Sequence, residues 1–215
     1  MSENVVRALD GETLLPERAT SDGTLRRIQE AALVSFGHLG YHGVSIRDLG
    51  RAAGIQPSSL YAHVKSKEQL LFDLVLLAHE EHREQIERGV MDAGPQPDDQ
   101  LRGFVHAHVS MHATYRMLAR VANRELAALS PDNQRKVRAV RDESVRLLEG
   151  ILSRGARLGV FVVPDTFLTA AAIGAMGLRV AEWWEPGADY TAEQVADYYA
   201  DLAVKMATAD ATVAP

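Results

Sequence analysis

The stretch from Gly54 to Leu71, GIQPSSLYAHVKSKEQLL, gathers small hydroxylated, aromatic and basic side chains in one short segment. Serine and tyrosine hydroxyls donate hydrogen bonds to phosphate oxygens or base edges, and lysines add positive charge. The hydroxyls belong to Ser58, Ser59 and Tyr61, and the charges to Lys65 and Lys67. Ala62, like the two serines, is small enough to let the backbone approach DNA closely. Their types and spacing indicate a surface that binds DNA. The alternative that they leave open is a tight helical corner with solvated serines.

The charge of the chain allows only a local surface of this kind. With 23 basic and 29 acidic residues, the formal net charge is −6, which argues against a protein that coats nucleic acid nonspecifically, because neutralisation of phosphates drives such binding. Between Ser45 and Lys67 the balance reverses, with four basic residues and one acidic residue. These are Arg47, Arg51, Lys65 and Lys67 against Asp48. A basic patch therefore lies within an acidic chain.

Two pairs of histidines have spacings that can share a metal ion. His108 and His112 are four residues apart, and His79 and His82 are three apart. Neither pair belongs to an H-E-x-x-H motif, and the sequence has no E-x-x-H pair, no G-x-S-x-G, no P-loop and no dinucleotide fingerprint. We therefore expect His108 and His112 to line a pocket or to be satisfied in the core. We expect no metal, no cofactor and no enzymatic activity.

Helical periodicity runs through most of the chain and predicts an all-α fold. Ser21 or Asp22 can cap a first helix that ends at Gly37 to Gly40, and the sequence GVMDAGPQPDDQ interrupts the helical pattern at residues 89–100. The other expected helices are Ser45 to Gly54, 57–64, Lys67 to about Arg88, 98–114, 115–129, 131–158, 165–184 and 192–208. We expect a flexible arm over 1–20, one domain over 21–75 and a larger helical domain over 76–210.

The two short helices before Lys67 match a helix-turn-helix. In this motif the first helix braces the second, and the second enters the major groove with its N-terminal residues facing base edges. Leu60 and Val64 are spaced to hold the second helix down from behind. This arrangement explains why so many small polar residues occupy a segment with little core face.

The sequence SIRDLGRAAGIQPSSLYAHVKSKEQLL closely resembles the N-terminal DNA-binding domain of the TetR family of bacterial transcriptional regulators. The matching positions are Ser45, Ile46, Ala52, Ala53, Gly54, Ile55, Leu60, Tyr61, His63, Lys67, Glu68 and Leu70. Val64 and Gly50 depart from the usual Phe and Ala of the family, which affects packing more than base contacts. The resemblance is specific over about residues 25–75.

The resemblance implies two groups of DNA contacts. Phosphates would be contacted by Ser45, Tyr61, His63 and Lys67, with Arg47 as a further candidate, and base edges would lie near Gln56, Ser58, Ser59 and Ala62. Tyr61 also has a partly buried alternative beside Leu60, and His63 can instead cap or hydrogen-bond within the domain. Lys67 begins a helix, where a cation opposes the macrodipole, so we expect it to contact phosphate.

The resemblance also implies that the C-terminal helices form a homodimer and enclose a small-molecule pocket. The segment TAAAIGAMGLRVAEWW carries small residues at close-approach spacing, and two tyrosines follow on the next helix. The expected interface residues are Ala170, Gly174, Gly177, Tyr198 and Tyr199. An ordinary internal helix crossing would need the same small residues and stays open as the alternative.

The segment FVHAHVSMHATYRMLARVANREL mixes apolar and polar groups on one helical face and is the candidate pocket wall. The residues expected to bind a ligand are Phe104, His108, Met111, Tyr115, Arg116, Asn123, Met176, Arg179 and Trp183. The alternative is that this stripe is simply core. A weaker resemblance to regulators of lipid or steroid breakdown implies a large hydrophobic acid or its coenzyme A thioester as the effector.

These observations predict a ligand-responsive transcriptional regulator, a repressor that binds a palindromic operator as a dimer. The alternative is a helical lipid- or protein-binding module that does not regulate DNA. The chain has no cysteine, the N-terminus lacks the pattern of a signal peptide, and the most apolar run, 167–178, is too short to span a bilayer. We therefore expect a cytoplasmic protein that does not enter membranes.

Overall fold

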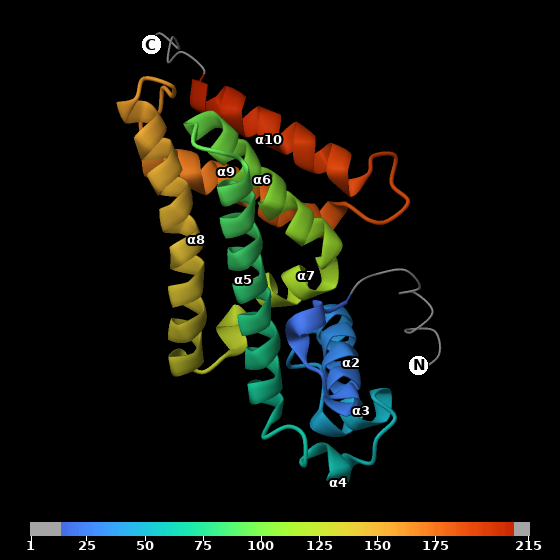
Figure 1. Ribbon diagram of the computed structural model, residues 1–215. Coiled ribbons are helices and arrows are strands. Elements are labelled where there is room, and N and C mark those ends of the chain that lie inside the picture. The colour runs from blue at the N-terminus through green and yellow to red at the C-terminus, as the bar shows by residue number, and fades with distance from the viewer. Residues whose placement is uncertain (1–13, 209–215) are drawn as a thin grey trace. The chain divides into compact units, whose positions relative to one another are not determined.

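The computed structural model describes residues 14–208, and every regular element in that range is a helix (Figure 1). The all-α prediction is therefore confirmed. In chain order the elements are η1 (Glu17–Ala19), α2 (Gly23–Leu39), α3 (Ile46–Ala52), α4 (Pro57–Leu60), α5 (Lys67–Asp92), α6 (Pro97–Thr114), α7 (Arg116–Arg124), η2 (Leu126–Ala128), α8 (Pro131–Arg157), α9 (Thr166–Trp183) and α10 (Ala192–Thr208).

The helix ends follow the capping residues of the sequence. Asp22 accepts hydrogen bonds from the backbone amides of Thr24 and Leu25 at the start of α2, at 2.8 and 3.2 Å. Thr191 and Gln194 form the expected reciprocal pair before α10, since the amide of Thr191 donates to Gln194 Oε1 and the amide of Gln194 donates to Thr191 Oγ1. The sequence therefore determines these boundaries through contacts two or three residues apart.

Two helices are shorter than predicted: α7 ends at Arg124, before the expected end at residue 129, and α4 ends before residue 64. It covers only Pro57–Leu60, whereas the expected helix continued to residue 64. The amides of Ala62 and His63 bond to carbonyls three residues back, at 3.1 and 3.0 Å, so the chain tightens into a turn instead of extending the helix. The turn still buries Leu60 and Val64.

The described residues form two compact units, and the boundaries between them fall inside α5, between α6 and α7, and inside α8. The first unit runs to Glu81 and includes Tyr115–Arg138, and the second contains His82–Thr114 and the chain from Ala139 onward. The unit with the helix-turn-helix is therefore larger than residues 21–75. Gly37 on α2 lies directly against Met117 on α7, where an added Cβ would meet the methionine sulfur.

Part of the expected flexible arm is ordered. Residues 1–13 lie outside the described residues, but Leu15 is buried and Arg18 Nε donates to Glu81 Oε2 at 2.8 Å. The guanidinium of Arg26 donates to the carbonyls of Leu15 and Pro16. These contacts hold residues 14–20 against the first unit, and a flexible arm over 1–20 stays a prediction.

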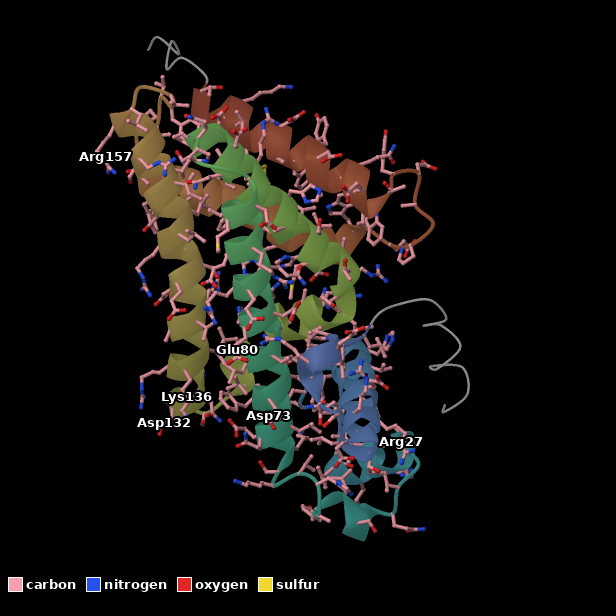
Figure 2. The ribbon with its side chains drawn as sticks, in the orientation of Figure 1. Arg27, Asp73, Glu80, Asp132, Lys136 and Arg157 are labelled. Carbon is pink, nitrogen blue, oxygen red and sulfur yellow. The ribbon has the colours of Figure 1, made fainter. Side chains whose placement is uncertain are left out.

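Each unit has an apolar core of its own. In the first unit, Phe72 on α5 is buried, and its ring centroid lies 5.5 Å from Nζ of Lys136 on α8, which is labelled in Figure 2. The buried residues of this core include Ile28, Leu33, Phe36, Leu49, Leu60, Leu70, Leu74, Leu118 and Val121. In the second unit, the core includes Ile86, Leu101, Phe104, Val105, Val109, Leu152, Phe161, Ile173, Val180, Ala196 and Ala203.

No helix among residues 14–208 is long and apolar enough to cross a membrane.

Candidate functional site

The candidate DNA surface is the exposed side of α3, α4 and the turn after α4. Exposed side chains there belong to Ser45, Arg47, Gln56, Ser59, Tyr61, Ala62 and His63, whereas Leu49, Leu60 and Val64 are buried behind them. The side chain of Ser58 lies outside the described side chains. Gly54 has a φ of 70° in the connection between the two helices, a conformation that glycine adopts without strain. The helix-turn-helix thus presents these seven side chains on one unit, outside its core.

Ser45 caps α3 in a reciprocal box with Asp48. The amide of Asp48 donates to Ser45 Oγ at 3.2 Å, and the amide of Ser45 donates to Asp48 Oδ2 at 3.0 Å. The Ser45 hydroxyl also donates to Asp48 Oδ2 at 2.5 Å, and these hydrogen bonds hold the pKa of Asp48 below its usual value. Arg51 pairs with Asp48 at 2.6 Å, so one cation of the basic patch is partly neutralised.

Lys67 has a structural role that the sequence argument did not identify. Its Nζ donates to the carbonyls of Tyr41 and Val44, at 2.9 and 2.7 Å, and lies 4.0 Å from the centroid of the Tyr41 ring. Partial burial lowers the pKa of Lys67. A cation at the start of α5 is unfavourable beside the positive end of the helix dipole, and this was the reason to expect a phosphate near Lys67. The two carbonyl oxygens offset this unfavourable position from within the chain. A phosphate contact from Lys67 stays a prediction.

Two other candidate contacts differ in their surroundings. His63 Nδ1 lies 3.6 Å from Asp22 Oδ2. This is the partner within the domain that the alternative to a phosphate contact called for. Tyr61 is 59% exposed, so its hydroxyl is accessible to a partner. Neither observation tests a contact with DNA.

Glu68, one residue after Lys67, fixes the helix-turn-helix to the rest of the first unit. Its Oε1 accepts hydrogen bonds from the amide of Ser130 and from Asn133 Nδ2, both at 3.0 Å. The Ser130 amide is the main cause that lowers the pKa of Glu68. The start of α5 is therefore anchored to the start of α8.

The nine residues expected to bind a ligand divide between the two units. Phe104, His108 and Met111 are buried on α6, and Met176 on α9 is partly buried against the same core. Arg179 and Trp183 are on α9, where Arg179 is exposed and Trp183 is 50% exposed. Tyr115, Arg116 and Asn123 belong to the first unit, so their part in a common pocket stays a prediction.

A second arrangement in this region was not predicted. His108 lies beside His82 on α5, with His82 Nε2 and His108 Nδ1 2.7 Å apart, and His112 lies one turn further along α6. Burial lowers the pKa of His108, and a hydrogen bond to the Gly174 carbonyl opposes part of this shift, so the neutral ring is favoured. The sequence showed two separate histidine pairs and gave no signal that one member of each would meet.

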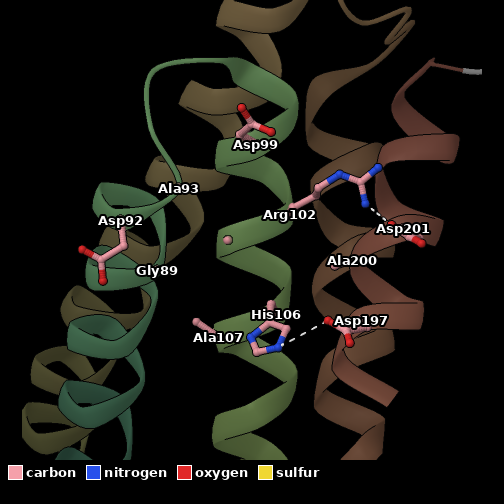
Figure 3. A pocket seen from close by; sticks show the side chains of 11 residues that line it. Gly89, Asp92, Ala93, Asp99, Arg102, His106, Ala107, Asp197, Ala200 and Asp201 are labelled. Carbon is pink, nitrogen blue, oxygen red and sulfur yellow. Dashed lines mark hydrogen bonds and ion pairs between the residues drawn. The ribbon is translucent and has the colours of Figure 1, made fainter. Parts of the chain in front are cut away.

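An open groove of about 700 Å³ lies over α5, α6 and α10 (Figure 3). None of the nine expected ligand residues lines it. Its ionisable side chains belong to Asp92, Asp99, Arg102, His106, Asp197 and Asp201, and Arg102 pairs with Asp201. His106 Nε2 lies 3.6 Å from Asp197 Oδ1. The carboxylates outnumber the cations, so this groove favours cationic or neutral groups over anions.

Two of the five expected interface residues are internal. Ala170 and Gly177 are buried within the second unit, and an added Cβ at Gly177 would overlap the ring of His108. The small size of Gly177 is therefore explained by a close approach inside the chain, as the alternative required. Gly174 has open space at its Cβ position, Tyr198 is exposed and Tyr199 is partly buried. Apolar residues that are exposed on α9 are Phe167, Leu168, Ala171, Ala172, Ala175 and Trp183.

A braced pair of short helices with an exposed polar face, followed by a helical unit with its own core, defines a helix-turn-helix regulator. Residues 28–74 match the family of bacterial regulatory proteins of the tetR type, and residues 94–207 match the tetracyclin repressor-like C-terminal domain. The chain therefore belongs to the TetR family. It is a ligand-responsive regulator that binds DNA, and a helical module without DNA regulation is not favoured.

Relatives along most of the chain are of the same kind. The chain is 26% identical over 185 residues to the HTH-type transcriptional repressor KstR2 of Mycobacterium tuberculosis, covering 79% of this chain and 86% of that protein. The structure of the TetR family regulator PfmR from Thermus thermophilus is similar with a TM-score of 0.76, 32% identity, and coverage of 84% and 97%. The structure of AibR in complex with isovaleryl coenzyme A and operator DNA has a TM-score of 0.75, 25% identity, and coverage of 86% and 97%.

Proposed function

We propose that this chain represses transcription by binding a palindromic operator as a homodimer. We further propose that a small hydrophobic effector, a lipid- or steroid-derived acid or its coenzyme A thioester, releases it. The observation that carries the DNA part is the exposed polar face of α3 and α4, which is backed by buried leucines. Two of its residues, Gln56 and Ser59, are exposed at α4 and are candidates to determine sequence preference.

The effector class is supported by similarity and by the chemistry of the second unit. AibR was crystallised with isovaleryl coenzyme A and operator DNA, and KstR2 is named a repressor. Phe104, Met111 and Met176 supply apolar surface for an acyl chain, and Arg179 on α9 can pair with a carboxylate or phosphate. The groove of Figure 3 is the poorer candidate, because its aspartates would repel the same anions.

The test is fluorescence anisotropy with DNA from upstream of the gene, against a scrambled duplex, over a salt series. We expect saturable binding of the first duplex at least about 10³-fold tighter than of the second. Adding isovaleryl coenzyme A or a long-chain acyl thioester should then release the DNA, whereas free coenzyme A should not.

Two results would contradict parts of this proposal. Stronger DNA binding in the presence of thioester would mean that the effector acts as a corepressor. Thioester binding without enrichment of any duplex in a genome-wide selection would instead support the helical module without DNA regulation.

A further inference from the structure

Three histidine rings meet inside the second unit, two from α6 and one from α5. One ring nitrogen of each of His82, His108 and His112 lies within 4.8 Å of those of the other two. The ring centroids are 4.6 to 5.6 Å apart, and His108 and His112 are each only 4% exposed. Buried imidazoles clustered in this way either share hydrogen-bonded protons or share a cation.

Backbone carbonyls assign the proton on two of the rings. His108 Nε2 lies 3.0 Å from the carbonyl oxygen of Gly174, and His112 Nδ1 lies 2.8 Å from the carbonyl oxygen of His108. A carbonyl oxygen only accepts, so both of these nitrogens carry hydrogen. In the neutral rings the lone pairs are therefore on His108 Nδ1 and His112 Nε2. Metal-binding histidines are usually oriented in the same way, with the second ring nitrogen donating to a carbonyl or carboxylate.

We propose that His82, His108 and His112 bind a divalent transition metal ion of the zinc class. Three imidazoles form a donor set that suits Zn²⁺, Co²⁺, Ni²⁺ or Cu²⁺ better than Mg²⁺ or Ca²⁺, which prefer oxygen ligands. Three protein ligands leave a fourth position for water or another donor. The chain has no cysteine that could compete for the ion.

To bind one ion, the three ligand nitrogens, which lie within 4.8 Å of one another, would change their separations by at most about 1.5 Å. Zn–N bonds of about 2.0 to 2.1 Å at a tetrahedral angle separate ligand nitrogens by about 3.3 Å. His82 Nε2 and His108 Nδ1 now share a hydrogen bond at 2.7 Å, so they would move apart by about 0.6 Å. The His82 proton would move to Nδ1 as Nε2 takes the metal, with no net proton released. His82 is only partly buried, so water can mediate this exchange.

Helix α9 restricts the His108 ring from the opposite side. Gly174 supplies the carbonyl for Nε2, and Gly177 is placed where any Cβ would overlap the ring. The ring therefore cannot turn without losing a hydrogen bond or moving α9. A bound ion would join α5 to α6, with α9 as a support for one ligand.

The test uses the intact chain without an affinity tag, treated with chelator and titrated with Zn²⁺ by calorimetry. We expect one Zn²⁺ per chain, and visible d–d absorption of a tetrahedral site when Co²⁺ replaces it. His82→Gln and His112→Gln should each weaken binding by about 100-fold or more, since even the loss of a supporting hydrogen bond costs about 10- to 100-fold. The matched control is the His106→Gln variant, which should bind Zn²⁺ with the affinity of the wild-type chain. His106 is a partly exposed histidine on the same helix and lies beside Glu193 and Asp197.

Retention of wild-type affinity in both His82→Gln and His112→Gln would overturn the site, as would the absence of saturable binding at micromolar Zn²⁺. Circular dichroism checks that each variant folds. Should a variant fail to fold, the wild-type chain decides the matter: with ¹⁵N-labelled histidine, Zn²⁺ should shift the ring nitrogens of three histidines together. Shifts in other histidines only would refute the assignment. None of these measurements depends on DNA or on the proposed effector.

Discussion

The ammonium group of Lys67 has two competing uses, and a substitution separates them. Lys67→Ala removes the bonds to the Tyr41 and Val44 carbonyls, so the free energy of unfolding should fall by about 1 kcal/mol after allowance for solvent screening. If Lys67 also neutralises a phosphate, DNA affinity falls for all sequences and the slope of log K against log salt decreases by about 0.9. Urea denaturation and an anisotropy salt series measure the two effects.

Exposed Lys65, two residues earlier, is the control for the stability measurement, because Lys65→Ala should leave stability nearly unchanged. A destabilised Lys67→Ala variant with an unchanged salt slope would limit Lys67 to its structural role.

Residue-scale predictions from the sequence succeeded where the partner is close in the chain. The caps at Asp22, Ser45 and Thr191 accept hydrogen bonds from amides two or three residues away, and a local pattern is enough to find them. The partners of Lys67 and Glu68 lie 23 to 65 residues away, and His82 and His108 are 26 apart. Nothing in a spacing of three or four residues indicates such contacts, so they appear only when the helices are packed.

At the scale of helices, the contact between α5 and α6 depends on two facing glycines. An added Cβ at Gly103 would overlap the carbonyl oxygen of Gly89, and one at Gly89 would lie 2.6 Å from that of Gly103. Gly103→Ala should therefore lower the free energy of unfolding by about 1 to 3 kcal/mol, because neither backbone can move aside cheaply. Gly150→Ala on α8, where the Cβ would meet nothing within 4 Å, should instead stabilise by up to about 1 kcal/mol. Denaturant titration of both variants measures the difference, and equal effects would refute the close contact.

The helices themselves could be predicted, but not which of them pack together. Capping residues and apolar periodicity placed α2, α5, α6 and α8 to α10 within a few residues. Two helices ended early: α4 in a turn that buries Val64, and α7 at Arg124, before the short helix η2. The assignment of Tyr115–Arg138 to the same unit as the helix-turn-helix was missed. This assignment depends on side-chain contacts between helices, such as Gly37 of α2 against Met117 of α7. Apolar periodicity does not predict which side chains make such contacts.

For the whole molecule, the exposed face of α9 is the surface on which the proposed dimer depends. A groove-binding helix is weak alone, and a dimer gains specificity by binding two half-sites one helical turn apart. Phe167, Leu168 and Ala175 are exposed on α9, where a second copy would cover them. We expect Ala175→Arg to convert the dimer to a monomer in sedimentation, since a buried unpaired cation is costly at an interface.

The same variant should lose most of its affinity for the full operator while its affinity for a single half-site stays unchanged, because the DNA-contacting side chains are untouched. Val145→Arg, an exposed apolar position on α8, is the matched control and should remain dimeric. If Ala175→Arg remained a dimer, the interface would not include this face of α9. Loss of half-site binding as well would mean that the substitution disturbs folding, and thermal denaturation of the variant distinguishes that result from a failed interface.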